Sequence, residues 1–333
     1  MGLERKIGTL PRGKKNNICD VTGLKVAHVT VDGAGAHTGV TAIIPASGDL
    51  FDQKLVAGVS VINGFGKSVG LVQVQEMGTL ESPIVLTNTL SVGTALTALT
   101  KYMLDKNEKI GRSESTVNCV VGECNDGRIN DIRGLHIKEE HVIEALEKAS
   151  DDFEEGAVGA GRGMICFGFK GGIGSSSRIV RFQDKDYTLG ALVLSNYGGK
   201  GKLRIEGKRV PVPSNEEDKG SIIIVIATDI PLSSRQLTRI ARRSSAALGR
   251  TGSILGSGSG DIAIAFSTAG RVPQSSEEAM ESFSVLHESK IDKVFEATVE
   301  AVEEAIYSSL YHAESMYERS GKKVCSLREM LDA

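Results

Sequence analysis

One serine stands where its hydroxyl could cut the chain's own backbone. Ser221 follows Gly220 and opens the most apolar run of the sequence, Ser221–Ala227, directly after a polar stretch, 198–220. A serine hydroxyl can attack the preceding carbonyl to give an ester that water hydrolyses, and a glycine before it tolerates strained backbone at low steric cost. Cleavage would leave Ser221 with an α-amine of reference pKa about 7.7–8.0, which suits a base for the adjacent hydroxyl. The spacing alone also fits an ordinary polar residue between a loop and a strand.

A glycine loop further along carries two hydroxyls and a carboxylate. Gly256–Asp261 reads GSGSGD and precedes the apolar run Ile262–Phe266. Ser259 and Asp261 could polarise a nucleophile and hold its amine through a hydrogen-bond relay. A phosphate-binding loop would need GxxxxGK[ST] and a following helix, and this loop has no lysine and precedes a strand-like run. The pattern favours a catalytic or structural loop.

Two more polar positions follow predicted strands. Asn196 ends the run Tyr187–Leu194, and its amide could donate to a developing oxyanion. Glu123 follows Val117–Val121 and could pair with a substrate ammonium. The alternatives are an asparagine that caps a turn and a surface turn, which the Asn125-Asp-Gly signal favours.

The pattern of apolar residues predicts the strands and helices that position these residues. Most predicted strands are continuously apolar, which is typical of strands covered on both faces. Apolar residues at helical spacing predict helices between them, and 277–317 is expected to hold two. Stacked helix, sheet, sheet and helix layers fit this order, as does a doubly wound parallel sheet. The other predicted strands are Gly39–Ile44, Ala57–Ile62, Ile84–Leu86, Met164–Phe169 and Ser221–Ala227; the helices are Ser91–Lys106, Lys138–Asp151 and Ser233–Leu248.

The stretch 198–220 is charged, glycine-bearing and contains Pro211 and Pro213, and it is predicted to be an exposed loop or linker. Glycine clusters at 156–163 and 170–175 are weak evidence for nucleotide binding, because no acidic residue stands at the distance a dinucleotide site requires. The six histidines form no HxH or HExxH pattern and there is no GxSxG elbow, so neither a metal site nor a Ser-His-Asp hydrolase is indicated.

The overall composition excludes some classes of binding partner. The 333 residues are 40% apolar, enough for a sizeable core, and the formal charge of −3 argues against a nucleic-acid binder or a polybasic membrane anchor. No run reaches the length of a membrane span and the N-terminus lacks a signal-peptide core, so a cytoplasmic location is expected. Five scattered cysteines suggest neither a disulfide framework nor a zinc site.

Eight segments, taken in order, resemble the L-aminopeptidase/D-esterase family, which includes the β-peptidyl aminopeptidases. The resemblance covers nearly the whole chain. The segments are Ile18–His28, Thr38–Pro45, Pro83–Gly93, Asn125–Asp131, Gly156–Gly161, Lys170–Ser175, Ser221–Leu232 and Gly258–Ile262.

The resemblance implies an α/β (α+β) fold in four αββα layers, like that of N-terminal-nucleophile hydrolases and ornithine acetyltransferase. It implies a single catalytic domain, 1–333, that is cut between Gly220 and Ser221 into an α chain, 1–220, and a β chain, 221–333. By the same resemblance Ser221 is the nucleophile, Ser259 and Asp261 assist it, Asn196 serves the oxyanion and Glu123 holds the substrate ammonium.

The implied activity is hydrolysis of N-terminal residues from short peptides, amides or esters through an acyl-enzyme. The resemblance implies a homotetramer, and it implies no metal or cofactor.

Two positions depart from the family pattern. Many members have an aromatic residue, which shapes the substrate pocket, where this chain has Asn125. Asp261 is one methylene shorter than the common glutamate. The alternatives are a related amidase or acyltransferase acting on nylon-type oligomers or pantetheine amides, an inactive ligand-binding relative, and a glycine-loop nucleotide enzyme.

Overall fold

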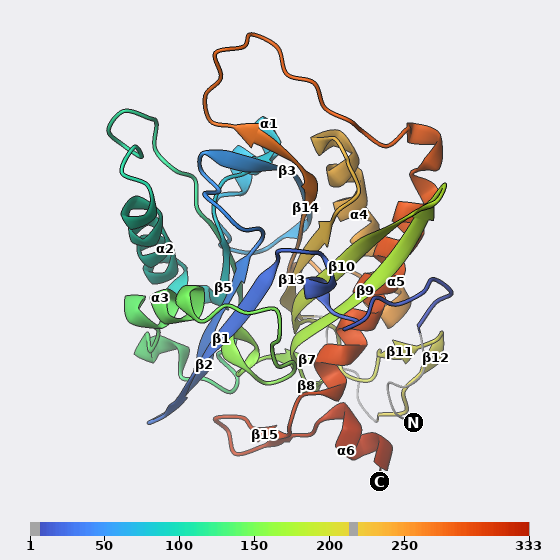
Figure 1. The fold of residues 1–333 in the computed structure, drawn as a ribbon. Helices are drawn as coiled ribbons and strands as arrows, with labels where there is room; N and C mark the ends of the chain where they lie inside the picture. The colour runs from blue at the N-terminus through green and yellow to red at the C-terminus, as the bar shows by residue number, and fades with distance from the viewer. Residues whose placement is uncertain (1–6, 213–218, 333) are drawn as a thin grey trace.

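A four-stranded sheet forms one half of the molecule. The computed structural model describes residues 7–212 and 219–332. The sheet has the order β1 (Lys25–Gly33), β2 (Ala36–Ile44), β5 (Ile84–Asn88), β6 (Val120–Cys124), and only the β5–β6 pair is parallel. The helices α2 (Val92–Lys106) and α3 (Glu139–Glu147) pack on its outer face (Figure 1).

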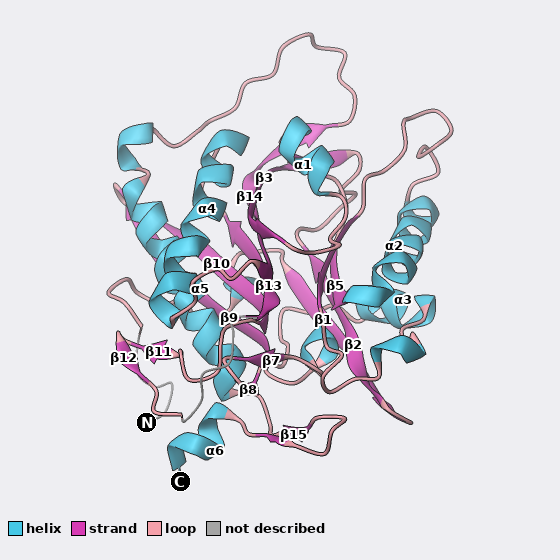
Figure 2. Ribbon diagram, turned by 180° about the vertical axis from the view of Figure 1, so that it is seen from behind, coloured by secondary structure: helices cyan, strands magenta, loops and turns pink. Residues whose placement is uncertain are grey.

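A six-stranded sheet forms the other half. Its order is β4 (Thr79–Leu80), β3 (Gln53–Gly64), β14 (Gly258–Pro273), β13 (Lys219–Thr228), β10 (Lys185–Asn196), β9 (Gly172–Phe182), and only the β13–β14 pair is parallel. The helices α4 (Ser234–Thr251) and α5 (Asp292–Tyr311) cover its outer face, as Figure 2 shows from behind. The two sheets face each other, which gives the predicted four layers.

Short elements complete the described chain. They are the helices α1 (Leu71–Met77) and α6 (Leu327–Asp332), and the hairpins β7 (Ile165–Cys166) with β8 (Phe169–Lys170), β11 (Arg204–Ile205) with β12 (Lys208–Arg209), and β15 (Met316–Tyr317) with β16 (Lys323–Val324). Single turns of 3-10 helix lie at Ile18–Asp20, Thr89–Ser91, Ile132–Gly134, Gly159–Gly161 and Glu288–Lys290.

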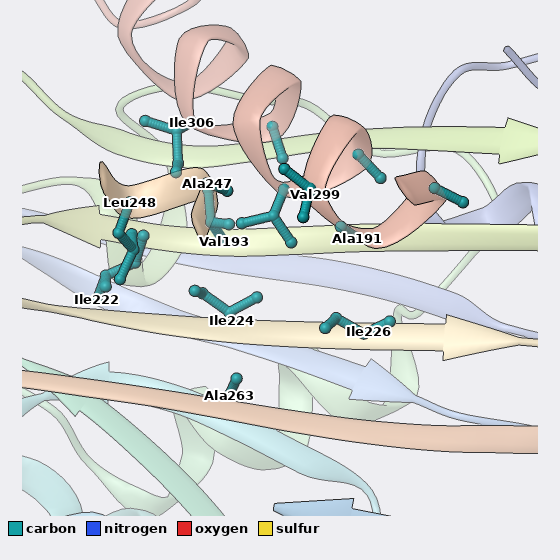
Figure 3. Packing of buried hydrophobic residues seen from close by; sticks show 14 of the residues in the cluster. Ala191, Val193, Ile222, Ile224, Ile226, Ala247, Leu248, Ala263, Val299 and Ile306 are labelled. Carbon is teal, nitrogen blue, oxygen red and sulfur yellow. The ribbon is translucent and has the colours of Figure 1, made fainter. Parts of the chain in front are cut away.

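The central strand β13 explains why its sequence is continuously apolar. Ile222, Ile224 and Ile226 point toward the helices α4 and α5, where they meet residues such as Leu248 and Ile306 (Figure 3). The intervening residues, Ile223, Val225 and Ala227, belong to the core between the two sheets. Each face of β13 is therefore buried, so the period-2 alternation of a strand with one wet face is absent. A third core lies between the four-stranded sheet and its helices.

Local signals fix the ends of α4. The side chain of Ser233 accepts a hydrogen bond from the backbone N–H of Gln236, and Gly252 ends the helix at φ +106°. These are a capping box and a left-handed C-cap.

Two of the predicted elements are wrong. Met164–Phe169 is not one strand: β7 and β8 form a hairpin whose turn carries Phe167 and Gly168 at positive φ. The segment 277–317 holds one long helix, α5, and 274–287 is an extended arch, the orange loop in Figure 1. Helix-forming composition in the arch was misleading, because Met280, Phe283 and Val285 are exposed and form no face that packs on the core.

The stretch 198–220 is only partly the exposed loop that was predicted. Residues 213–218, including Pro213, lie outside the described residues. Before them, Leu203 and Val210 are buried in the core under α4 and α5 and frame the hairpin of β11 and β12. None of the helices in the described part of the chain combines the length and the hydropathy that a membrane span requires.

Candidate active site

The Gly220–Ser221 bond lies within the start of β13. Ser221 pairs with Asn196 on β10 to one side and with Gly260 on β14 to the other. Its side chain is buried, and its Oγ accepts a hydrogen bond of 3.2 Å from the backbone N–H of Gly260. The hydroxyl is therefore held by the glycine loop that was predicted to assist it, and the Ser221 backbone lies next to Asn196.

Gly220 has a conformation that only glycine adopts without strain. Its φ is +131°, and a Cβ on Gly220 would overlap the carbonyl oxygen of Asn196. Both observations require glycine, because an L side chain rarely adopts this φ and has no room here. The bond before Ser221 therefore follows a residue in an unusual backbone conformation that packs closely against the neighbouring strand β10.

Ser259 and Asp261 form the pair that their spacing suggested. The hydroxyl of Ser259 donates to Oδ1 of Asp261 over 2.5 Å, and both side chains are buried. The parallel register places Gly220 opposite Ser259 and Ser221 opposite Gly260. The peptide bond between Gly220 and Ser221 therefore runs beside this pair, within the same two strands.

Asn63 holds this glycine loop and was not predicted. Its Nδ2 donates to the carbonyl of Gly256 over 3.0 Å and to the carbonyl of Ser259. The backbone N–H of Phe65 donates to the same Ser259 carbonyl over 3.2 Å. Asn63 follows the predicted strand Ala57–Ile62, so the signal that identified Asn196, a polar residue directly after an apolar run, was available for it too.

Asn196 has one side-chain atom fixed by each of two neighbouring loops. Its Oδ1 accepts from the N–H of Ile165 over 2.9 Å, and its Nδ2 donates to the carbonyl of Asn125 over 2.9 Å. These two bonds set the orientation of the side chain. The amide NH₂ group has two N–H donors, and the bond to Asn125 uses one of them.

Lys170 anchors the loop that presents Ile165. Its Nζ donates to the carbonyls of Gly161, Met164 and Gly171 over 2.7–3.0 Å, and the side chain is fully buried. Burial shifts the pKa of this amine well below its ordinary value. The sequence had placed Lys170 only in a glycine cluster, because its bonds to the backbone carbonyls of Gly161, Met164 and Gly171 depend on the local chain conformation and not on a pattern of side chains.

Glu123 is buried rather than part of a surface turn. Its Oε1 accepts from the backbone N–H of Lys67 over 2.7 Å, and its Oε2 accepts from the hydroxyl of Thr89. A Cβ on Gly66 would lie 3.2 Å from Oε1 of Glu123 and 3.9 Å from Cα of Gly260. The segment around Gly66 therefore joins this carboxylate to the β14 side of Ser221.

A cavity of about 660 Å³ brings several predicted residues together. Asn125, Asn196 and Gly220 all line it, and Asn125 is exposed.

Asp126 stands next to Asn125, and its carboxyl is buried. Burial raises the pKa of this carboxyl to about 6, although hydrogen bonds from Thr38 and Asn130 act to lower it. Among the residues that the structure describes, no cluster of three His, Cys, Asp or Glu side chains is suited to a metal ion.

Comparisons with known proteins give the family. Residues 16–324 match the model of peptidase family S58. A β-peptidyl aminopeptidase of Sphingosinicella microcystinivorans is 37% identical over 334 residues, which cover 91% of this chain and 83% of that protein.

Two solved structures are similar over nearly their whole length. A Pyrococcus horikoshii protein has 50% identity and a TM-score of 0.93, covering 99% of this chain and 96% of its own. The L-aminopeptidase D-Ala-esterase/amidase of Ochrobactrum anthropi has 36% identity and a TM-score of 0.88, covering 97% and 94%; its fold is described as a variant of the N-terminal-nucleophile hydrolase fold.

The chain belongs to peptidase family S58 and is a hydrolase of peptide bonds. The family, the fold class and the enzyme class that the sequence predicted are confirmed.

Proposed function

We propose that this S58 peptidase is a self-processing serine aminopeptidase, which removes N-terminal residues from short peptides, amino-acid amides or esters. Relatives at 36–37% identity are named as aminopeptidases, which supports release of N-terminal residues. The observation that carries the proposal is the Gly220–Ser221 bond, with Gly220 at φ +131°, the Ser221 hydroxyl bonded to the Gly260 N–H, and Ser221 paired with Asn196 on the neighbouring strand.

Processing would convert the single catalytic domain, 1–333, into chains 1–220 and 221–333. The Ser221 Oγ attacks the Gly220 carbonyl, its proton passes to the Ser221 nitrogen, the C–N bond breaks, and the nitrogen leaves as the α-amine of Ser221. Water then hydrolyses the ester and leaves a carboxylate on Gly220. The buried Ser259–Asp261 pair lies on the neighbouring strand, opposite Gly220 and Ile222, and would hold the new amine by hydrogen bonds.

Turnover would reuse the same atoms. The α-amine of Ser221 takes the hydroxyl proton, Oγ attacks the first carbonyl of the substrate, and the proton passes to the leaving amine. Water then hydrolyses the acyl-enzyme and releases the N-terminal residue. The reference pKa of an α-amine, about 7.7–8.0, suits this work near neutral pH.

Asn196 would donate to the oxyanion in both reactions. Its side chain is fixed by Ile165 and Asn125 before substrate arrives, so no reorganisation is needed when charge develops. A preorganised donor of this kind supplies about 2.7–4 kcal/mol where it has been removed by mutation.

Glu123 would anchor the substrate ammonium. Two donors, Lys67 N–H and the Thr89 hydroxyl, hold its carboxylate in place without neutralising its charge. A buried carboxylate that lacks a cation is costly, and a substrate ammonium would supply the missing charge. Such an anchor would select substrates that have a free N-terminus.

The test is the Ser221→Ala variant. It should remain one chain on a denaturing gel and should not hydrolyse amino-acid anilides, because both reactions need the same hydroxyl. The wild-type protein purified in parallel should give two bands and be active. Two bands from the alanine variant, or full amide turnover by wild-type protein with an uncut backbone, would disprove the mechanism.

A related amidase or acyltransferase that acts on non-peptide amides is the second candidate. Exposed Asn125, in place of an aromatic residue, leaves the cavity open to larger acyl or amine groups. A panel of amides with free and blocked amines distinguishes the two, because the Glu123 anchor requires a free amine.

We also propose a cytoplasmic homotetramer. All five cysteines are free, in keeping with a reducing compartment. Exposed apolar side chains on the arch, Met280, Phe283 and Val285, are candidates for contacts between subunits.

A further inference from the structure

Two of the described residues that line the cavity beside the Gly220–Ser221 bond are cationic. Arg128 and Lys200 line it together with Gly220 and Asn196, and no aspartate or glutamate is among its described lining residues. Arg128 is already paired: its Nη2 contacts Oε1 of Glu318 over 2.5 Å. Lys200 forms no ion pair within the described part of the chain, so it is the cation whose charge remains available.

Lys200 is held in position by its stem. A Cβ on Gly168 would overlap the Lys200 side chain from Cβ to Cδ, and Gly168 sits at φ +79° in the turn between β7 and β8. The methylene stem thus lies directly against glycine backbone, and Lys200 is half-buried. A cation fixed in this way loses less rotamer freedom on binding an anion than a freely moving surface lysine does.

The two sides of Ser221 differ in charge. On the β14 side, Gly260 lies near Gly66, which touches the Glu123 carboxylate. On the β10 side, Asn196 and Gly220 open onto the cavity that contains Lys200. A substrate whose ammonium lies at Glu123 and whose scissile carbonyl lies at Ser221 therefore extends its leaving group toward Lys200.

We propose that this cavity is a subsite for the carboxylate of the leaving amino acid, bound by Lys200. The preferred substrates are then dipeptides with a free C-terminal carboxylate, rather than amides, esters or longer peptides. In a dipeptide the carboxylate carbon is only two bonds beyond the scissile nitrogen, at bond lengths of about 1.5 Å. It therefore remains inside a cavity of about 660 Å³. The inference rests on the proposed aminopeptidase function.

The experiment compares two substrates that share one scissile bond. L-alanyl-L-alanine and its C-terminal amide are assayed for kcat/KM, beside the β-alanyl pair and alanine p-nitroanilide. Wild-type enzyme should prefer the acids by about tenfold, the effect expected of one charge-assisted hydrogen bond. Lys200→Met should lose that preference, with anilide turnover changed less than about twofold. Lys200→Arg should retain it, and the preference should shrink at high salt.

Lys202→Met is the matched control. Lys202 lies two residues further along the same loop and does not line the cavity, so this variant changes net charge equally and should keep the preference. Equal kcat/KM for acid and amide in wild-type enzyme would overturn the subsite, as would a preference that survives Lys200→Met. Anilide hydrolysis without cleavage of either acid would also overturn it. If the wild-type enzyme turned over none of these substrates, the result would instead count against the proposed function.

Discussion

At the residue scale, the proposed cleavage of the Gly220–Ser221 bond depends on the absence of a side chain at position 220. Gly220→Ala should stop self-cleavage, because a Cβ would overlap the Asn196 carbonyl and would be strained at φ +131°. Strain of this kind costs about 1–3 kcal/mol before the overlap is counted. We expect one band on a denaturing gel and loss of at least about 90% of anilide turnover.

Gly207→Ala is the control for that substitution. Gly207 also has positive φ, +77°, but nothing lies within 4 Å of a Cβ built there. This variant should be cut and active like the wild type. Normal processing of Gly220→Ala would show that the close approach to Asn196 plays no part in the cleavage.

Sequence patterns predicted the residues that stand next to one another in the chain, and their partners followed only from the fold. Ser259 and Asp261 are two residues apart, and their hydrogen bond is what that spacing suggested. Asn63 donates to the carbonyl of Gly256 in a distant loop, and Lys170 donates to the carbonyl of Met164 within its own stretch of chain; both bonds depend on the folded backbone. Glu123 was hard to place for the same reason: its burial depends on Lys67 and Thr89.

At the element scale, apolar runs identified the strands but left their direction open. β13 reads as a strand of a parallel sheet, yet it pairs in parallel only with β14 and antiparallel with β10. The run is continuous because helices cover one face and a second sheet covers the other, and either architecture buries both faces. The serine-rich strand β9 was not predicted, because its polar residues form no apolar run. Ser175, Ser176 and Ser177 are buried, and their hydroxyls are satisfied by hydrogen bonds inside the protein.

One buried arginine joins three elements. Arg178 on β9 contacts Glu300 and Glu304 of α5 at 3.0 Å and 2.7 Å, and it donates to the Ile7 carbonyl of the N-terminal segment. Arg178→Ala would leave two buried carboxylates close together without that cation. We expect a loss of about 3–5 kcal/mol in the free energy of unfolding, measured by urea denaturation.

Arg181→Ala provides the comparison on the same strand. Arg181 is exposed and lies 3.5 Å from an exposed Asp186, so its loss should cost less than about 1 kcal/mol. Equal effects of the two substitutions would mean that the buried cluster contributes no more than a surface ion pair.

At the scale of the whole molecule, the proposed cut falls inside a sheet to which both products contribute. β13 and β14 come from 221–333, apart from the first residues of β13, whereas β3 and β10, on either side of them, come from 1–220. The helix α5 of the second product packs on β9 and β10 of the first, and it carries much of the core shown in Figure 3. Neither product retains a complete core without the other.

The two products of self-cleavage should therefore stay together. Separating them would expose both faces of β13, where Ile222 to Ala227 are all buried, and burial of one such side chain is worth about 1.5–3 kcal/mol. Wild-type protein should elute from a sizing column in native buffer as one species that contains both chains. It should show two chains only on a denaturing gel, and the uncut Ser221→Ala variant should elute at the same volume. Elution of a free 221–333 chain in native buffer would contradict the interleaved sheet as the source of cohesion.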